Sequence, residues 1–310
     1  MEIEKRMRRK MNKKAMFFTI LVIALLSLFL VSYTIYSVVQ DRSAISKRIQ
    51  TMNSFLFSLE QDLERQGKIA GFRTIFLAED YITRTGNYIS DIDSFFQEAF
   101  FNGTIYGQET EIMVGARYED ILQSVNEKAS KINVDITIDE PELSVLQEDP
   151  WHVALLFSFN LTMQDSTGLA SWSKRENIKS LVKVEGFEDP LYVINTNAKL
   201  TNKINKTIYE TFVQNGDVSN LSAHAENSYY KASTTAPSFL NRLQGKTQGN
   251  ENGIESLVYL PKLAQQGISI REKSVVDYIY FSTENPSSQQ VTGMPDWFRL
   301  DSEHLSIYTG

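Results

Sequence analysis

An uncharged, apolar run near the N-terminus constrains this chain more than any other feature. Residues 15–40 contain no Asp, Glu, Lys or Arg in 26 positions, and Leu, Ile, Val and Phe predominate. A membrane-spanning helix needs about 20 apolar residues, so the run is long enough to cross a bilayer with some tilt. A cleaved secretory signal has a shorter apolar core of about 7–15 residues, which ends at small residues. This run ends at Tyr33, Tyr36 and Val38 instead. We therefore expect a retained transmembrane helix over residues 15–39.

The charge distribution predicts how that helix is oriented. Residues 1–14 carry seven basic and two acidic side chains, a net charge of +5 in a chain whose total is −7, so the remainder carries −12. Basic residues beside a membrane span stay on the cytoplasmic side. We expect a basic cytoplasmic leader at 1–14 and an extracellular main domain, held to the lipid bilayer of the cell membrane by a single pass. The acidic outer part argues against a nucleic-acid partner.

The helix is expected to continue beyond the membrane as an amphipathic stalk over residues 40–66. Apolar residues follow one another at spacings of three and four, which is a heptad pattern. This predicted helix-packing seam consists of Ile45, Ile49, Met52, Leu56, Leu59 and Leu63. Two interpretations stay open, because the seam either packs on the chain's own globular part or on copies of the same helix. Gln66-Gly67-Lys68 and Gly71 are expected to end the stalk.

The junction between the basic leader and the apolar run resembles a known family. Lys13-Lys14-Ala15, followed at once by residues 16–20 (MFFTI), is similar to the start of archaeal type IV pilin-like proteins. The whole chain also resembles, more loosely, uncharacterised membrane-anchored surface proteins of archaea. The pilin resemblance implies leader cleavage between Ala15 and Met16, and assembly with copies of itself or other pilin-like subunits through the N-terminal helix. Many pilins carry Glu at the fifth position after the cut, where this chain has Ile20.

The rest of the chain predicts an α+β fold. We expect a helical segment at 67–131, with helices over 72–100 and 110–131, a bend at Gly86-Asn87 and an end at Asn102-Gly103. Period-two alternation over 134–138, 151–163 and 178–184 predicts an antiparallel β-meander within 132–186. Glu140-Pro141 is expected to turn the first strand.

Residues 187–310 predict a mixed α+β part of the extracellular head. The expected elements are strands at 190–194, 275–281 and 297–308, helices at 204–209 and 253–264, and loops at 213–253 and 286–290. No Pro-rich or charged linker precedes this part, so we expect it to pack beside the meander.

Chemical motifs are scarce. The chain has no Cys, which excludes disulfides, thiolate metal sites and a Cys nucleophile. The three histidines, His152, His224 and His304, lie at least 72 residues apart. Common nucleotide-binding and hydrolase motifs are missing, and the Ser-x-x-Lys match at Ser171 and Lys174 is attributed to chance. We assign no catalytic, cofactor-binding or metal residue. One acidic group is interpreted as a solvated face rather than a calcium site; it consists of Asp135, Asp139, Glu140 and Glu142.

Four Asn-x-Ser/Thr sequons offer candidate N-glycosylation sites on the predicted outer side. They begin at Asn102, Asn160, Asn205 and Asn220. About as many sequons are expected by chance, so the prediction depends on their positions, all of which lie on the predicted outer side.

These features together predict a non-enzymatic cell-surface structural protein of pilin-like type, anchored or assembled through its N-terminal helix. The alternative is a membrane-tethered ligand-binding or sensory ectodomain, with a pocket between the meander and residues 187–310. An anchored enzyme, with a site assembled from distant residues, is the third hypothesis.

Overall fold

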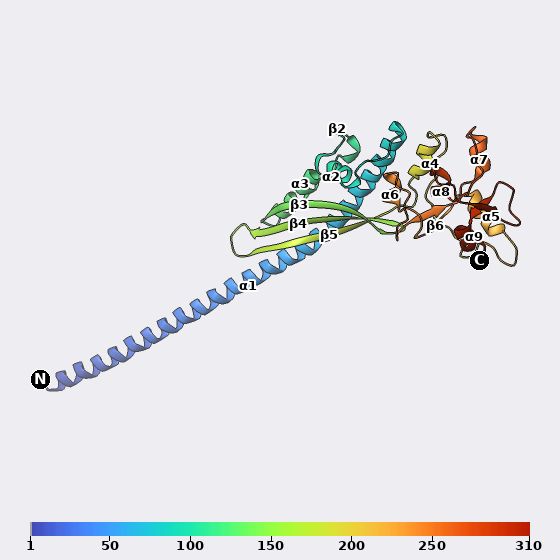
Figure 1. The fold of residues 1–310 in the computed structure, drawn as a ribbon. Helices are drawn as coiled ribbons and strands as arrows, with labels where there is room; N and C mark the ends of the chain where they lie inside the picture. Colours follow the sequence, from blue (N-terminus) through green and yellow to red (C-terminus); the bar gives the residue numbers. More distant parts are fainter. Residues whose placement is uncertain (1) are drawn as a thin grey trace.

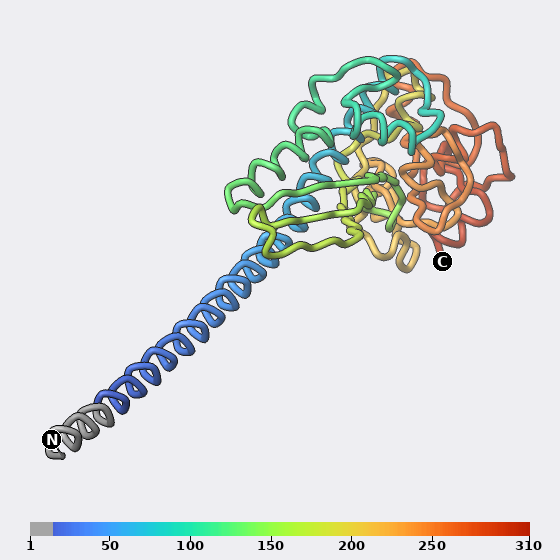
Figure 2. The backbone as a smooth tube through the Cα atoms, turned by 90° about the vertical axis from the view of Figure 1, so that its left-hand side faces the viewer, coloured from blue at the N-terminus to red at the C-terminus, as the bar shows by residue number. Residues whose placement is uncertain are grey.

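A single long helix at the N-terminus is the largest element of the fold, and other elements pack against its C-terminal half. The computed structural model describes the backbone of residues 2–310 and the side chains of residues 15–310. Helix α1 (Glu2–Thr85) extends out of a compact head, and its second half packs against that head (Figures 1 and 2). From Ala15 to Thr85 it has 71 residues, which corresponds to about 107 Å. The C-terminus lies at the end of the head opposite to the protruding helix (Figure 1).

The expected break of this helix at Gly67 and Gly71 is wrong, because α1 continues to Thr85. Both glycines lie where the helix crosses strands β4 (His152–Asp165) and β5 (Ser171–Lys183). A Cβ atom at Gly67 would lie 2.3 Å from the Ser180 Oγ, and one at Gly71 would lie 2.7 Å from Leu155 Cδ1. The glycines therefore allow close approach of helix and sheet. This contact outweighs their helix-propensity cost of about 1 kcal/mol each.

Two shorter helices follow α1. Gly86 has a positive φ of 67° just after the end of α1, where the sequence predicts a bend. Helix α2 (Ile92–Asn102) is capped by Asp91, which accepts a hydrogen bond from the Ser94 amide, and it ends at Gly103 as predicted. The predicted helix 110–131 is divided into the 3₁₀ turn η1 (Glu111–Met113) and α3 (Tyr118–Ser130). A small hairpin of β1 (Thr104–Ile105) and β2 (Gln108–Glu109), which the sequence did not predict, precedes them.

The predicted meander is present as an antiparallel sheet with strand order β3-β4-β5. Its first strand, β3 (Val134–Asp149), passes through Glu140-Pro141, so the expected turn there is wrong. The register instead shifts between Asp139 and Glu142. Such a β-bulge accommodates the proline, which has no amide hydrogen for the ladder. The chain reverses after Asp149.

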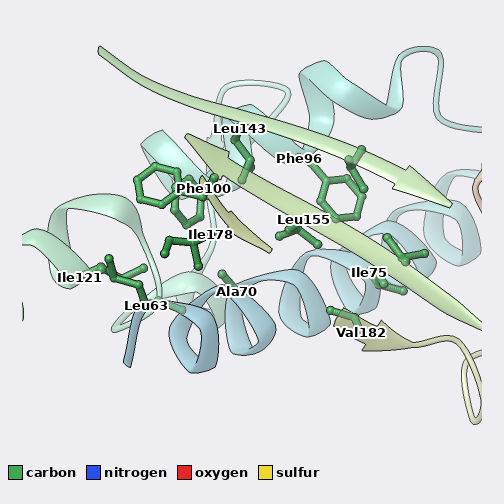
Figure 3. Packing of buried hydrophobic residues seen from close by; sticks show 14 of the residues in the cluster. Leu63, Ala70, Ile75, Phe96, Phe100, Ile121, Leu143, Leu155, Ile178 and Val182 are labelled. Carbon is green, nitrogen blue, oxygen red and sulfur yellow. The ribbon is translucent and has the colours of Figure 1, made fainter. Parts of the chain in front are cut away.

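The main core lies between the helices and one face of the meander. Helix α1 lies along β5 and β4, whereas α2 and α3 cover β3. Figure 3 shows buried side chains from these elements meeting in one cluster. The labelled members are Leu63, Ala70, Ile75, Phe96, Phe100, Ile121, Leu143, Leu155, Ile178 and Val182. The α+β fold class predicted from the sequence is confirmed.

The C-terminal part has short elements, and several predictions for it are wrong. The expected strand 190–194 is helix α4 (Pro190–Asn195), because the Asp189 carboxylate caps the Leu191 amide and proline occupies the first turn. The expected strand 275–281 is mostly helix α8 (Asp277–Phe281). The expected strand 297–308 is β9 (Arg299–Asp301) followed by α9 (Ser302–Thr309), whose N-cap is Asp301.

The remaining differences share one cause, which is that short apolar runs do not distinguish helix from strand. Residues 204–209 form irregular chain with one β-bridge, at Lys206, instead of a helix, and residues 213–253 contain regular elements instead of loops alone. The other elements are α5 (Ser219–Glu226), β6 (Tyr230–Ala232), α6 (Phe239–Leu243), β7 (Ile254–Ser256), α7 (Leu260–Gln265) and β8 (Ser288–Gln290). Thus the predicted helix 253–264 begins as strand β7, and the predicted loop 286–290 contains β8.

Residues after 187 pack directly beside the meander. Phe187, Val193, Phe239 and Leu243 belong to the same buried cluster as the sheet. A second apolar cluster, around Leu257, lies further into the C-terminal part.

Candidate functional site

The first part of α1 is the most unusual surface of the molecule. Every side chain from residue 15 to residue 44 is exposed. The most apolar 18-residue window has a mean hydropathy of 2.7, and none of it is buried. Ala15 and Met16, the predicted cleavage pair, lie at the start of this segment. We call residues 15–39 the apolar segment. Its length and composition are compatible with a single membrane span.

The predicted packing seam is divided between the head and solvent. Met52, Leu56, Leu59 and Leu63 are each 4–8% exposed and belong to the head's core. By contrast, Ile49 is 44% exposed, and Ile45 is half-buried. The interpretation that the seam packs on the chain's own domain therefore holds for residues 52–63. Ile45 and Ile49 lie below the main core, toward the apolar segment.

Polar contacts mark the point where α1 enters the head. The Arg48 guanidinium pairs with the Asp165 carboxylate and donates to the Asn133 carbonyl at 2.6 Å. Asp165 lies at the β4–β5 turn, which is on the side of the head nearest the protruding helix (Figure 1). The Thr167 hydroxyl and Arg48 together lower the pKa of Asp165 to about 2, although burial opposes this. Further along α1, Asp62 forms an ion pair with Lys128 of α3, in which the Lys128 Nζ lies 2.6 Å from the Asp62 carboxylate. These contacts fasten the sheet and α3 to the helix.

A fully buried arginine holds the C-terminal part together. Arg242 on α6 lies 2.6 Å from the Asp189 carboxylate and 2.9 Å from that of Asp277. The Tyr230 hydroxyl also donates to Asp189 at 2.8 Å. Burial opposes the charge, yet the two carboxylates raise the pKa of Arg242 above its ordinary value. This cluster joins the starts of α4 and α8 to α6, so we interpret it as structural.

A second buried polar cluster surrounds His304. Its Nδ1 lies 2.8 Å from Asp301 Oδ1, and its Nε2 lies 3.3 Å from Glu255 Oε2 and 3.2 Å from the Tyr278 hydroxyl. Burial works against protonation, but the two carboxylates raise the pKa of His304 to about 9. The ring is therefore an imidazolium at neutral pH and donates to both carboxylates. A protonated ring cannot act as a general base, and a metal ion would bind it only by displacing the proton.

Three side chains at the start of α9 lie close enough together to ligate a metal ion. Oxygen and nitrogen atoms of Asp301, Glu303 and His304 lie within 4.8 Å of one another. The proton on His304 already supplies the positive charge between the carboxylates. The other two histidines are elsewhere, since His224 is buried with its pKa lowered to about 3 by desolvation, and His152 pairs with Asp149 at 2.8 Å.

The other residues that the sequence singled out are dispersed over the surface. Ser171 and Lys174 lie on strand β5, where residues three apart point to opposite faces. Glu142 and Glu140 lie 2.8 Å and 3.9 Å from Arg175, which supports the interpretation of this acidic group as a solvated face. Of the sequon asparagines, Asn102, Asn205 and Asn220 are exposed, and Asn160 is half-buried, donating to Glu140.

Both buried clusters escaped the sequence analysis. Arg242 is 53 residues from Asp189 and 35 from Asp277, and His304 is 49 from Glu255. No local spacing signals such pairs. Comparison of the chain with protein-family models, curated proteins and solved structures finds no match.

Proposed function

We propose that this protein is a non-enzymatic cell-surface structural protein of pilin-like type. It is anchored in the membrane, or assembled with copies of itself, through α1. One observation carries the proposal, which is that the same continuous helix is bare and apolar in its first part and forms the core of a head in its second.

The energetics of the apolar segment support this proposal. Eighteen large apolar side chains between Met16 and Val39 are each at least 39% exposed. Fully burying a side chain of this kind is worth about 1.5–3 kcal/mol. The segment therefore gains some tens of kcal/mol when lipid or other helices cover it. A soluble monomer would leave this surface in water, so we propose the bilayer as the first partner.

Orientation and processing follow from the charged leader. The net charge of +5 in residues 1–14 favours a cytoplasmic N-terminus and an extracellular head. Cleavage between Ala15 and Met16 would make Met16 the first residue of the mature chain. Copies of the freed helix would then pack side by side, and the exposed Ile49 and half-buried Ile45 would extend the contact below each head.

The mature N-terminus of the native protein tests the pilin-like part. Mass spectrometry of the membrane fraction is expected to find Met16 as the first residue. A chain that keeps residues 1–14 would instead be an ordinary anchored protein. Protease treatment of intact cells tests the orientation separately, because it should degrade the head. A C-terminal tag that survives this treatment would contradict an extracellular head.

A groove on the head favours a second function, that of a tethered ligand-binding ectodomain. The sequence placed the pocket between the meander and residues 187–310. The groove of about 430 Å³ on this side of the head lies instead between Phe72 and Phe76 of α1 and residues 185–188. A larger one, of about 530 Å³, lies between the end of α1 and the β1–β2 hairpin.

A further inference from the structure

The groove at the end of α1 combines aromatic and polar side chains. One wall consists of Tyr81 and its neighbours on the last turns of α1, and the other is the β1–β2 hairpin with the start of η1. Its volume of about 530 Å³ lies within the usual range of ligand sites, about 300–1,000 Å³. The polar lining residues are Asp80, Arg84, Thr85, Gln108, Glu109, Thr110 and Glu111.

A strained turn presents an aromatic ring to this groove. Tyr106 and Gly107 form the two-residue loop between β1 and β2, and both have positive φ, at 47° and 76°. Hairpin turns of this kind favour Asn or Asp before the glycine, because a bulky residue with positive φ is strained. Tyrosine at this position costs backbone energy, yet its side chain is 49% exposed. Burial of the ring does not explain the choice of residue.

The neighbouring helix α2 holds that turn in place. The Glu98 carboxylate accepts hydrogen bonds from the Gly107 amide at 2.7 Å, the Tyr106 amide at 3.1 Å and the Thr104 hydroxyl at 2.8 Å. Burial opposes the charge, but these three donors hold the pKa of Glu98 below its ordinary value. Glu98 is thus a positioning residue, and it offsets the strain at Tyr106.

The Tyr106 ring is supported from behind. Its centroid lies 4.8 Å from that of Tyr81 and 6.0 Å from that of Phe95, which is buried. Two aromatic contacts fix the plane of the ring, while half of its surface stays open. The result is a rigid aromatic platform beside carboxylates, a guanidinium and amide or hydroxyl groups.

From this arrangement we infer that the groove binds a neutral carbohydrate chain, with a sugar ring stacked on Tyr106. The C–H face of a pyranose packs on an aromatic ring, and the hydroxyl groups around it bond to carboxylate, amide and guanidinium groups. The Asp80–Arg84 ion pair, at 2.6 Å, offers both an acceptor and a donor beside the platform. Asp80, Glu109 and Glu111 outnumber Arg84, so the lining repels acidic sugars. Such a site would serve a single anchored chain and an assembly equally.

A proline-rich peptide is the alternative occupant of an aromatic groove. Proline has neither a hydroxyl nor a backbone N–H group, so a proline-rich peptide would offer no hydrogen-bond donor to the carboxylates of Asp80, Glu109 and Glu111. The polar groups around Tyr106 therefore favour a sugar.

Binding measurements on the full chain in phospholipid nanodiscs test the inference, since sugar-based detergents would compete. The calorimetric probes are maltohexaose, cellohexaose and the hexamer of N-acetylglucosamine, with hexagalacturonate as the acidic control and decaproline as the peptide control. At least one neutral hexasaccharide is expected to bind, and the two controls are not. The Tyr106→Asn variant is expected to weaken binding by roughly tenfold or more, because the stacking surface is lost.

Tyr106→Asn also separates binding from folding. Asparagine suits the positive φ of this turn better than tyrosine, and this gain offsets the lost contacts with Tyr81 and Phe95, so the midpoint of thermal unfolding should change little. Val114→Asn is the matched control, because Val114 is 59% exposed in the same region and does not line the groove. It should leave binding unchanged. The inference is overturned if no neutral hexasaccharide binds at millimolar concentration, if binding survives Tyr106→Asn, or if decaproline alone binds.

Discussion

Replacing Gly71 by alanine tests whether this glycine is a contact point or a helix breaker. The added methyl group would lie 2.7 Å from Leu155 Cδ1 and 2.8 Å from Val182 Cγ2. Leu155 and Val182 are 1% and 2% exposed, so neither has space into which to move. Overpacking of this kind costs about 1–3 kcal/mol, and better helix propensity returns about 1 kcal/mol. Because both contacts are tight, we expect the upper end of this range to apply, which gives a net destabilisation of about 2 kcal/mol.

The expected loss is large enough to measure. For a domain of this size it corresponds to a fall of about 4–8 °C in the thermal unfolding midpoint. Circular dichroism of the full chain in nanodiscs follows the transition. Ser58→Ala, on the exposed face of the same helix, is the control and should change the stability by less than about 0.5 kcal/mol. Val182→Ala combined with Gly71→Ala should cost less than the sum of the two single changes, because one of the clashing methyl groups is gone.

The opposite result would refute the argument. If Gly71→Ala raised the unfolding midpoint, the helix and sheet could separate without cost, and helix propensity alone would govern this position. Additive effects of Gly71→Ala and Val182→Ala would show that the two side chains do not compete for the same space.

Three further predictions concern the charged groups and the apolar segment. Arg242→Met should destabilise the head by about 3–5 kcal/mol, measured by urea unfolding, because two buried carboxylates lose their counter-charge. His304 contributes stability that is fully present below pH 6.5 and is lost as the pH rises through about 9. The wild-type unfolding midpoint minus that of His304→Gln should therefore shrink between pH 7 and 9.5, and a constant difference would contradict the pairing. Deleting residues 15–39 should move the protein from the membrane fraction to the soluble fraction in flotation assays, and continued flotation would show another membrane contact.

The sequence predicted the long helix and the meander because their patterns are long. The uncharged run extends over 26 positions, residues 15–40, and the alternation that predicts β4 extends over thirteen residues, 151–163, so both signals average over many side chains. The helix was expected to end at Gly67 and Gly71 because the local sequence around a glycine does not show whether it ends a helix or permits a close contact. Only the partner strands, more than eighty residues away, distinguish the two cases.

The C-terminal part resisted prediction for a different reason. Its elements are mostly three to eight residues long, and an apolar run of that length fits a helix or a strand. Asp277 illustrates this, because it begins α8 while accepting hydrogen bonds from Arg242 and Ser256. Distant polar partners therefore helped to decide the local structure. The Tyr106 turn escaped prediction too, since tyrosine is not a turn residue and Glu98 supports it from another element.

The predicted seam changes from exposed at Ile49 to buried at Met52, so the head begins close to the apolar segment and would lie close to a membrane surface. Arg48 fixes the β4–β5 turn to α1, and it lies only eight residues beyond Gln40, the last residue of the uncharged run. Along a helix this separation is about 12 Å. The helix contains no break between the apolar segment and the core of the head. A head joined in this way cannot swing on a flexible linker, so in a bilayer its orientation would follow the tilt of the apolar segment. In an assembly, neighbouring helices would therefore bring their heads together at the level of Arg48, and this is where contacts between copies should be sought first.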